Sequence, residues 1–167
     1  MRSIFLLRSI AVALCLTGLV PAIHAQSTIV AQRNLSIDLA LTIAREALME
    51  CRAKGFHTSV VVLDRASQVL VVLRDESANA GTVDMARRKA YTAQLFRGST
   101  AEFQQRTASD PKFAAQKDVT DTLALGGGLP IQSRGEILGG VASSGANPID
   151  DEACAKAGIA KVADELK

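Results

Sequence analysis

Few side chains in this sequence could ligate a metal ion or act as a catalytic base. His57 is the only histidine after residue 25, so two imidazoles of one chain cannot ligate the same ion, and we assign no catalytic residue. His57 precedes a predicted strand and is either a ligand or an exposed strand-end residue. Tyr91 is the only tyrosine; its phenolate could bind ferric iron, or its ring could pack with the hydroxyl at the rim.

Charged side chains cluster at three places. Arg74, Arg88 and Lys89 could bind the carboxylates of a ligand, although a solvated face would explain them equally. The acidic run at residues 150–152 resembles a metal-binding cluster. At the start of a helix, however, acidic side chains cap free amides and meet the positive end of the dipole, so we interpret this run as a cap.

Gly126, Gly127 and Gly128 form a run of glycines before an apolar segment. Glycine in or beside a strand marks a bulge or close helix packing, or it lets a ligand approach the backbone. Both interpretations stay open for Gly127 and Gly128.

The elements that must position these residues are two hairpins and several helices. Short apolar segments predict hairpins over 58–63 with 69–73 and over 129–132 with 137–143. Apolar residues at helical spacing predict helices from Ser36 to Gly55, over 82–96 and from Asp150 onward, with a short helix over 100–106. A weak edge strand is predicted over 28–30. This order predicts an α+β domain with one antiparallel sheet flanked by helices.

The first hairpin is apolar on both faces, with Val61 and Leu63 on one face and Val60 and Val62 on the other. Both faces must therefore be covered, by helices or by a neighbouring subunit, and we expect a homo-oligomer. Cys51 lies on the buried stripe of its helix, whereas Cys154 lies off the predicted stripe of the last helix. This phase favours a buried thiol at Cys51 over a disulfide.

Residues 1–25 have the features of a secretory signal peptide: two arginines, an apolar core and a small residue before the predicted cut after Ala25. Residues 26–167 would then form one soluble domain, periplasmic or secreted, with no membrane segment. Cleavage lowers the formal net charge from +2 to zero, so composition offers no basis for binding nucleic acid.

Three blocks of the sequence resemble the GlcG/HbpS-like family of small haem-binding or haem-degrading domains, which are related to the C-terminal domain of PduO-type cobalamin adenosyltransferases. The blocks are VVVLDRASQVLVVLRDESA, ARRKAYTAQLF and GGGLPIQSRGEILGGVASSGANPIDDEACAKAGI. The resemblance as a whole covers about 35–166. By position, Lys89 matches the family's Lys-Ala-x-Thr-Ala helix, and Gly127, Gly128 and Asp151 match its Gly-Gly-x-Pro to Asp-Glu block. Ala66-Ser67 departs from the family's turn glycine and suggests a different turn.

The resemblance implies a profilin-like fold with a central antiparallel sheet of four to five strands, and assembly into dimers or larger oligomers. On this resemblance, together with the glycines and the one imidazole, we expect haem or another tetrapyrrole as the ligand, against the glycine-lined sheet edge or at a subunit interface. His57 or Tyr91 would be the axial donor, and Lys89, Arg74 or Arg88 would meet the propionates. Transport, sensing and degradation of haem are all compatible with the resemblance, and degradation would make the protein an enzyme. The alternative is a non-catalytic oligomeric module for another small molecule, such as a hydroxy-acid, or for a protein partner, which the few aromatic residues favour.

Overall fold

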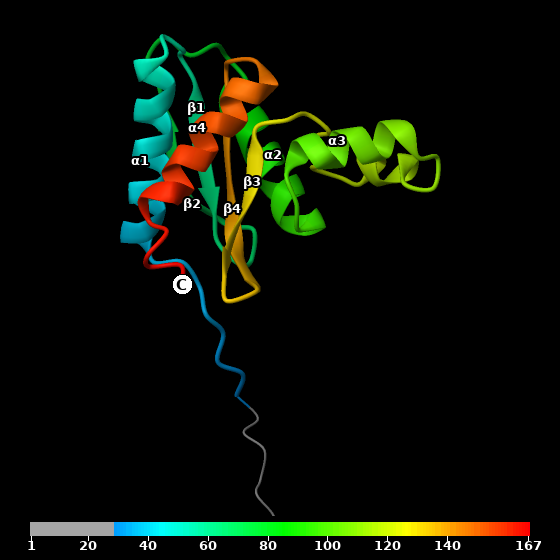
Figure 1. Ribbon diagram of the computed structural model, residues 1–167, viewed down its shortest axis with the longest axis horizontal. Coiled ribbons are helices and arrows are strands. Elements are labelled where there is room, and N and C mark those ends of the chain that lie inside the picture. Colours follow the sequence, from blue (N-terminus) through cyan, green and yellow to red (C-terminus); the bar gives the residue numbers. More distant parts are fainter. Residues whose placement is uncertain (1–28) are drawn as a thin grey trace, which may run out of the picture. The chain divides into compact units, whose positions relative to one another are not determined.

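Four antiparallel strands form the centre of the fold (Figure 1). The computed structural model describes residues 29–167, so the predicted signal peptide lies outside the described residues. The strands are β1 (Ser59–Leu63), β2 (Val69–Arg74), β3 (Gly128–Ser133) and β4 (Glu136–Ser144), and their order in the sheet is β2-β1-β4-β3. Both predicted hairpins are confirmed. The prediction of an edge strand over 28–30 is wrong for Ile29 and Val30, which form no strand, and Thr28 is not described.

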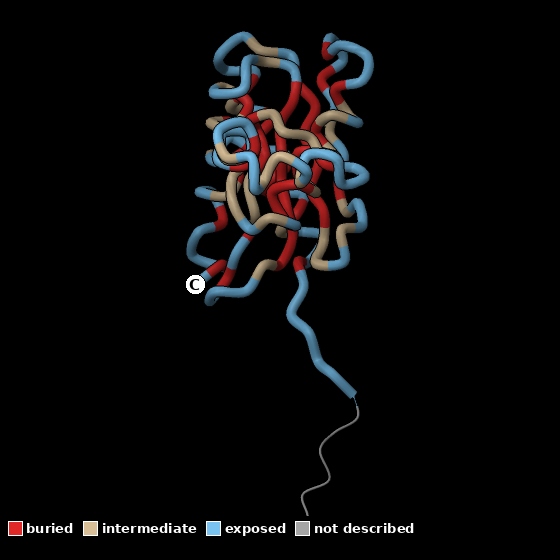
Figure 2. The backbone as a smooth tube through the Cα atoms, turned by 90° about the vertical axis from the view of Figure 1, so that its right-hand side faces the viewer, coloured by how far each residue is buried: buried red, intermediate tan, exposed pale blue. Residues whose placement is uncertain are grey.

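Helices cover the sheet on both faces. The helices α1 (Ile37–Ala53) and α4 (Pro148–Lys161) pack on one face, and α2 (Thr82–Phe96) packs on the other (Figure 1). Val60 and Val62 point into the α1 and α4 layer, whereas Val61 and Leu63 point toward α2. Every residue of β1 is buried, and the central strands form the buried middle of the molecule (Figure 2). Helices thus cover a strand that is apolar on both faces.

The N-terminal helix agrees with its predicted apolar period. Ser36 caps α1 by accepting a hydrogen bond from the amide of Leu39. The predicted stripe is the buried set of this helix: Ala40, Ile43, Ala44, Ala47, Leu48 and Cys51. In α2, the polar side chain of Gln94 is buried, and its amide donates to the carbonyls of Asp64 and Arg65 in the β1–β2 turn.

The buried face of α4 is wider than the predicted one: Ala155, Val162 and Leu166 are buried as expected, and Cys154 and Gly158 are buried beside them. Gly158 packs directly on α1, and a Cβ at this position would lie 2.4 Å from the carbonyl oxygen of Ile43. Close contact along this line buries Cys154 and Ala155, while Ala163 is exposed beyond the end of the helix. The prediction that placed Cys154 off the stripe is therefore wrong, because contact with α1 decided which face is buried.

The turn that departs from the family's glycine is built by side chains. Ser67 adopts a positive φ of 62°, which is uncommon for a residue other than glycine. Asp64 supports this turn, since its carboxylate accepts hydrogen bonds from the amides of Ala66 and Gln68. The hairpin therefore closes without glycine.

A helical arm extends beside β3 (Figure 1). It contains α3 (Thr100–Ser109), three residues longer than predicted, and a 3₁₀ turn, η1 (Ala114–Asp118). The guanidinium of Arg106 lies 5.3–5.8 Å from the ring centroids of Phe96, Phe103 and Phe113, within cation–π range. Three of the few aromatic side chains thus stabilise this arm. None of the described helices combines the length and apolar composition needed to cross a membrane.

Candidate functional site

Two residues from distant parts of the sequence form a buried ion pair. The ammonium of Lys89 on α2 lies 2.9 Å from Asp151 Oδ2 on α4 and donates a further hydrogen bond to the carbonyl of Ser143 on β4, at 3.3 Å. Both charged side chains are only 1% exposed. A buried ammonium needs such a partner, because an unpaired charge in the interior is very costly. Lys89 therefore joins the two helix layers through the end of the sheet.

The interpretation of residues 150–152 as a helix cap is wrong for Asp151. Asn147 is the N-cap of α4, since its side chain accepts from the amides of Ile149 and Asp150. Asp151 instead turns inward, where its Oδ1 accepts from the amide of Ala146 at 3.1 Å while Oδ2 meets the lysine. Asp150 remains in the exposed first turn, where a negative charge suits the helix dipole.

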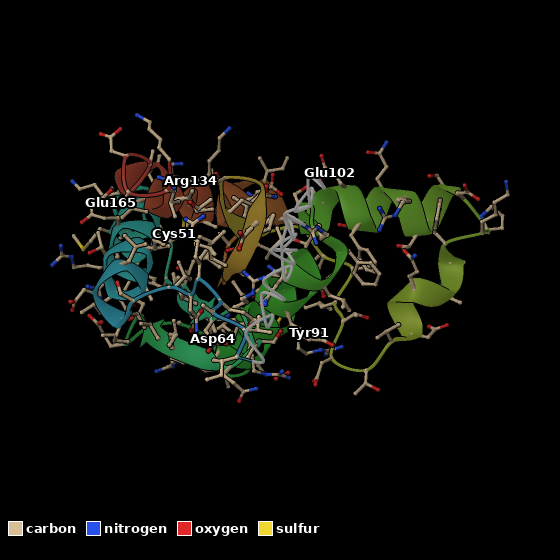
Figure 3. The ribbon with its side chains drawn as sticks, turned by 90° about the horizontal axis from the view of Figure 1, so that it is seen from below. Cys51, Asp64, Tyr91, Glu102, Arg134 and Glu165 are labelled. Carbon is tan, nitrogen blue, oxygen red and sulfur yellow. A yellow bond between two sulfur atoms is a disulfide. The ribbon has the colours of Figure 1, made fainter. Side chains whose placement is uncertain are left out.

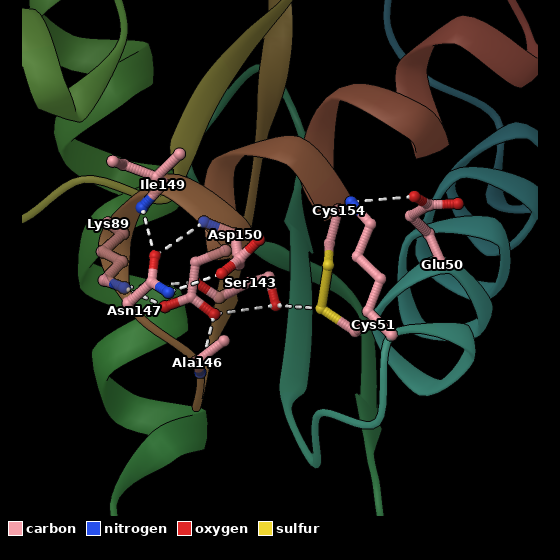
Figure 4. The surroundings of a disulfide bond; sticks show 11 residues. Glu50, Cys51, Lys89, Ser143, Ala146, Asn147, Ile149, Asp150 and Cys154 are labelled. Atoms are coloured by element: carbon pink, nitrogen blue, oxygen red, sulfur yellow. Dashed lines mark hydrogen bonds and ion pairs between the residues drawn. A yellow bond between two sulfur atoms is a disulfide. The ribbon is translucent and has the colours of Figure 1, made fainter.

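A disulfide lies next to this ion pair (Figure 4). Cys51 of α1 and Cys154 of α4 are bonded, with a Cα–Cα distance of 5.5 Å that is normal for a disulfide. This corrects the expectation of a free thiol at Cys51. Ser143 Oγ lies 3.5 Å from Cys51 Sγ and 3.4 Å from Asp151 Oδ1. The disulfide, one serine and the ion pair thus form one continuous buried cluster.

Gly127 and Gly128 lie against this cluster rather than at an open sheet edge. A Cβ at Gly128 would lie 2.5 Å from the carbonyl oxygen of Lys89, and one at Gly127 would lie 2.9 Å from the ammonium of the same lysine. Gly127 also has a positive φ of 125°. Close packing against α2 therefore accounts for both glycines, in agreement with the packing interpretation of the sequence.

A pocket of about 360 Å³ opens beside the ion pair. Lys89 and Asp151 contribute to its lining, together with Met85 and Thr82 of α2 and the loop around Gly145. Because the ammonium is already bound to Asp151, a ligand propionate would have to compete with a carboxylate of the protein itself. In the described conformation, Lys89 functions as a structural cation.

His57 lies in a different arrangement just before β1. Its side chain is 59% exposed, and its Nδ1 lies 3.0 Å from Oδ1 of Asp75, which is itself buried. Arg52 donates to the other oxygen of Asp75 at 2.6 Å. The amide of Ser77 and then the Arg52 guanidinium lower the pKa of Asp75 to about 2, and His57 contributes to the same shift. Asp75 therefore stays ionised and fixes the imidazole by one nitrogen.

The remaining predicted residues are dispersed. Tyr91 is half-buried on α2, on the opposite side of the sheet from Cys51 (Figure 3). Arg88 donates to the carbonyl of Thr122 at 2.7 Å, and Arg74, which is exposed, donates to the carbonyl of Ala78. Among the described residues, no hydrogen bond or ion pair joins His57 to Tyr91. The structure thus gives the two candidate iron donors separate environments.

Sequence reasoning missed the pairing of Asp75 with His57, and it missed the buried cluster formed by Asp151 and the disulfide. Lys89 and Asp151 both lie in the blocks that carry the family resemblance, so their shared occurrence was the available signal. Asp75 carried no comparable signal, because a carboxylate at a strand end is usually solvated. The described residues contain no group of three or more His, Cys, Asp or Glu side chains placed to hold a metal ion.

Comparison with known proteins identifies the family. Residues 35–160 match the family described as haem degrading protein HbpS-like. The chain belongs to the HbpS-like family. A search of curated proteins returned no match.

Solved structures agree with this membership. HbpS is 34% identical with a TM-score of 0.77, over 83% of this chain and 97% of HbpS. A double mutant of HbpS from Streptomyces reticuli is 32% identical with a TM-score of 0.78, over 87% of this chain and 98% of the mutant chain. A PduOC complex with haem shares the fold at 22% identity and a TM-score of 0.70, over 77% of this chain and 94% of PduOC.

Proposed function

We propose that this protein is an exported haem- or tetrapyrrole-binding protein in which His57 is the axial donor. The observation that carries the proposal is the pairing of His57 Nδ1 with Asp75 beside an exposed imidazole edge. Metal-bound histidines generally donate their second ring N–H to a carboxylate, which fixes the tautomer and leaves Nε2 as the ligand atom. No described residue forms a hydrogen bond with Nε2 of His57.

Asp75 suits this supporting role because its charge persists. Its pKa of about 2 keeps the carboxylate ionised at any physiological pH, and Arg52 holds it in place from the other side. Bound haem would supply an iron with an open coordination position, and the protein would supply the imidazole and its orientation. Family membership and the haem complex of a protein with the same fold support this choice of ligand.

The solvent exposure of His57 also supports a haem site formed between two copies of the chain. A porphyrin face needs apolar cover, and the imidazole is more than half exposed in the single chain. A second copy of the chain would supply the second wall. Arg74 is partnered with Ser59 in the sheet, two residues after His57. Its exposed guanidinium donates to the carbonyl of Ala78 and would use its remaining N–H groups for a propionate at the same end of the sheet.

Export is supported by two independent features. Residues 1–25 have the composition of a signal peptide, and Cys51 is disulfide-bonded to Cys154, a bond typical of oxidising compartments outside the cytosol. Periplasmic or secreted protein should therefore begin at Gln26, which N-terminal sequencing of the exported form would test.

A haemin titration of residues 26–167, followed by Soret absorbance, tests the ligand. We expect a saturable shift that His57→Ala abolishes and Tyr91→Phe preserves. Asp75→Asn should weaken haem affinity about 10- to 100-fold, as loss of a carboxylate behind a metal-bound histidine does. Circular dichroism on each variant controls for folding.

The same titration can refute the proposal. A linear response of the wild-type protein would mean nonspecific adsorption of haem. Loss of the shift in Tyr91→Phe with its retention in His57→Ala would transfer the donor role to the phenolate. Degradation requires a further result, the release of iron and a biliverdin-like product when reductant is added to the complex.

A further inference from the structure

A second pocket lies between the helical arm and the start of α4. Its volume is about 390 Å³, in the lower range for small-molecule sites. Apolar side chains form much of its wall: Ala101 from α3, and Pro148, Ile149 and Ala153 from α4. Neither His57 nor Tyr91 contributes to its lining, so this pocket is separate from the proposed haem donors.

Ile149 is an exposed apolar side chain at this pocket. It is 82% exposed in the first turn of α4. Asn147 caps that helix through the backbone amide of Ile149, so the cap does not explain an apolar side chain at this position. Together with Pro148 it offers an apolar surface at the opening of the pocket. An apolar body of a ligand would be covered on both sides here, by α3 and by α4.

Three polar side chains also line the pocket, those of Gln104, Glu152 and Lys156, and one carboxylate oxygen of Glu152 is unpartnered. Oε2 of Glu152 is buried and has no hydrogen-bond partner among the described residues. Such an oxygen is costly to leave unsatisfied, particularly on a charged group. Burial, followed by repulsion from Glu102 of α3, raises the pKa of Glu152, and Lys156 opposes this shift. The carboxylate therefore lacks the donor that would compensate its burial.

The charges around the pocket favour a cation. Glu152 and Glu102 both contribute negative charge, and the carboxylate of Glu102 is held in place because it accepts a hydrogen bond from the amide of Ser99. Lys156 is exposed, so its charge is more strongly screened by solvent. An anionic head group would meet the buried carboxylate unfavourably.

We infer that this pocket binds a small organic cation with an apolar body, such as an alkylammonium ion, whose N–H group donates to the carboxylate of Glu152. The hydrocarbon chain lies between α3 and α4 against Ala153 and Ile149. The ammonium neutralises a carboxylate whose Oε2 the described residues leave without a hydrogen-bond partner. This assignment is independent of haem binding and concerns a different set of residues.

Three six-carbon probes with different head groups test the inference: hexylammonium, hexanol and hexanoate. Each is titrated into the ¹⁵N-labelled chain of residues 26–167, and amide chemical shifts are followed. We expect saturable shifts at the amides of Gln104, Glu152 and Ala153, with hexylammonium binding at least about tenfold more tightly than the other two probes, since a charge-assisted hydrogen bond distinguishes it.

Variants separate the carboxylate from the apolar wall. Glu152→Gln keeps the size of the side chain and should remove the preference for hexylammonium over hexanol. Ala153→Leu should fill the pocket and weaken binding of all three probes. Glu165→Gln, at an exposed carboxylate outside the pocket, should change neither result. The amide spectrum of each free variant shows that it is folded.

Three outcomes would overturn the inference. The first is an absence of saturable shifts with hexylammonium, and the second is tighter binding of hexanoate, which would indicate an acid-binding pocket instead. The third is an unchanged preference for the cation in Glu152→Gln. Because no readout involves the Soret band, failure here leaves the haem proposal unaffected, and failure of the haem titration leaves this test intact.

Discussion

Replacing Lys89 with methionine should be among the most destabilising single changes in this protein. Methionine keeps the length and apolar character of the side chain but removes the charge that faces Asp151 at 2.9 Å. Asp151 would then keep only the amide of Ala146 and the hydroxyl of Ser143 as donors, in a position where its side chain is 1% exposed. Leaving one member of a buried ion pair uncompensated costs about 3–5 kcal/mol.

The measurement is thermal and urea unfolding of residues 26–167, followed by far-UV circular dichroism. For a chain of this size, each kcal/mol lowers the melting temperature by about 2–4 °C, so we expect a decrease on the order of 10–15 °C. Lys161→Met is the matched control, because Lys161 pairs with Glu46 at 3.8 Å on the surface and is 59% exposed. That variant should change the stability by less than about 0.5 kcal/mol.

A double variant tests whether the effect comes from the pair itself. Combining Lys89→Met with Asp151→Asn removes both charges, so the double variant should lose less stability than the two single variants together, by about 0.5–3 kcal/mol. If Lys89→Met unfolds at the same temperature as Lys161→Met, or if the two single effects add, the buried pair does not hold the helix layers as we argue.

Three further predictions concern stability. Reduction, or replacement of Cys51 and Cys154 by alanine, should cost up to about 4–5 kcal/mol, because the bond closes a sequence separation of 103 residues; urea unfolding with and without reductant measures this. The pKa of Asp75 is lowered from 3.8 to about 2, so its stabilising contribution is complete above about pH 4 and is lost as the pH falls toward 2. The urea midpoint of the wild-type protein should therefore fall across this range, and that of Asp75→Asn should fall less steeply. Gly128→Ala should cost about 1–3 kcal/mol, since its Cβ would lie 2.5 Å from the Lys89 carbonyl oxygen; a melting temperature equal to wild type would contradict this close packing.

Residue type alone made His57 a candidate iron ligand, but the support for that role comes from its neighbours in the structure. The sequence identified His57 as the only imidazole after residue 25, but it left open whether this side chain is a ligand or simply exposed. Asp75 gives the ligand hypothesis its physical support, and it reaches His57 from the end of β2, eighteen residues further along the chain. Nothing in the local sequence distinguishes this buried carboxylate from the exposed Glu76 beside it.

Local periodicity was sufficient to predict those features that depend on a single helix or hairpin. The stripe of α1 follows from 3.6 residues per turn, and the two hairpins follow from short apolar runs separated by turn residues, so both could be read before any tertiary contact was known. The apolar faces of β1 likewise required cover on both sides, which α1, α4 and α2 provide.

Contacts between elements decided the rest. Which face of α4 is buried depends on the close approach of Gly158 to α1, and this approach also brings Cys154 to Cys51. Whether Asp151 caps its own helix or neutralises Lys89 depends on where α2 lies, 62 residues earlier in the chain. The sequence alone therefore determined the elements and the family, because both depend on local pattern. The pairing of charges and sulfurs was decided only by the tertiary structure, since partners distant in sequence compete with local ones.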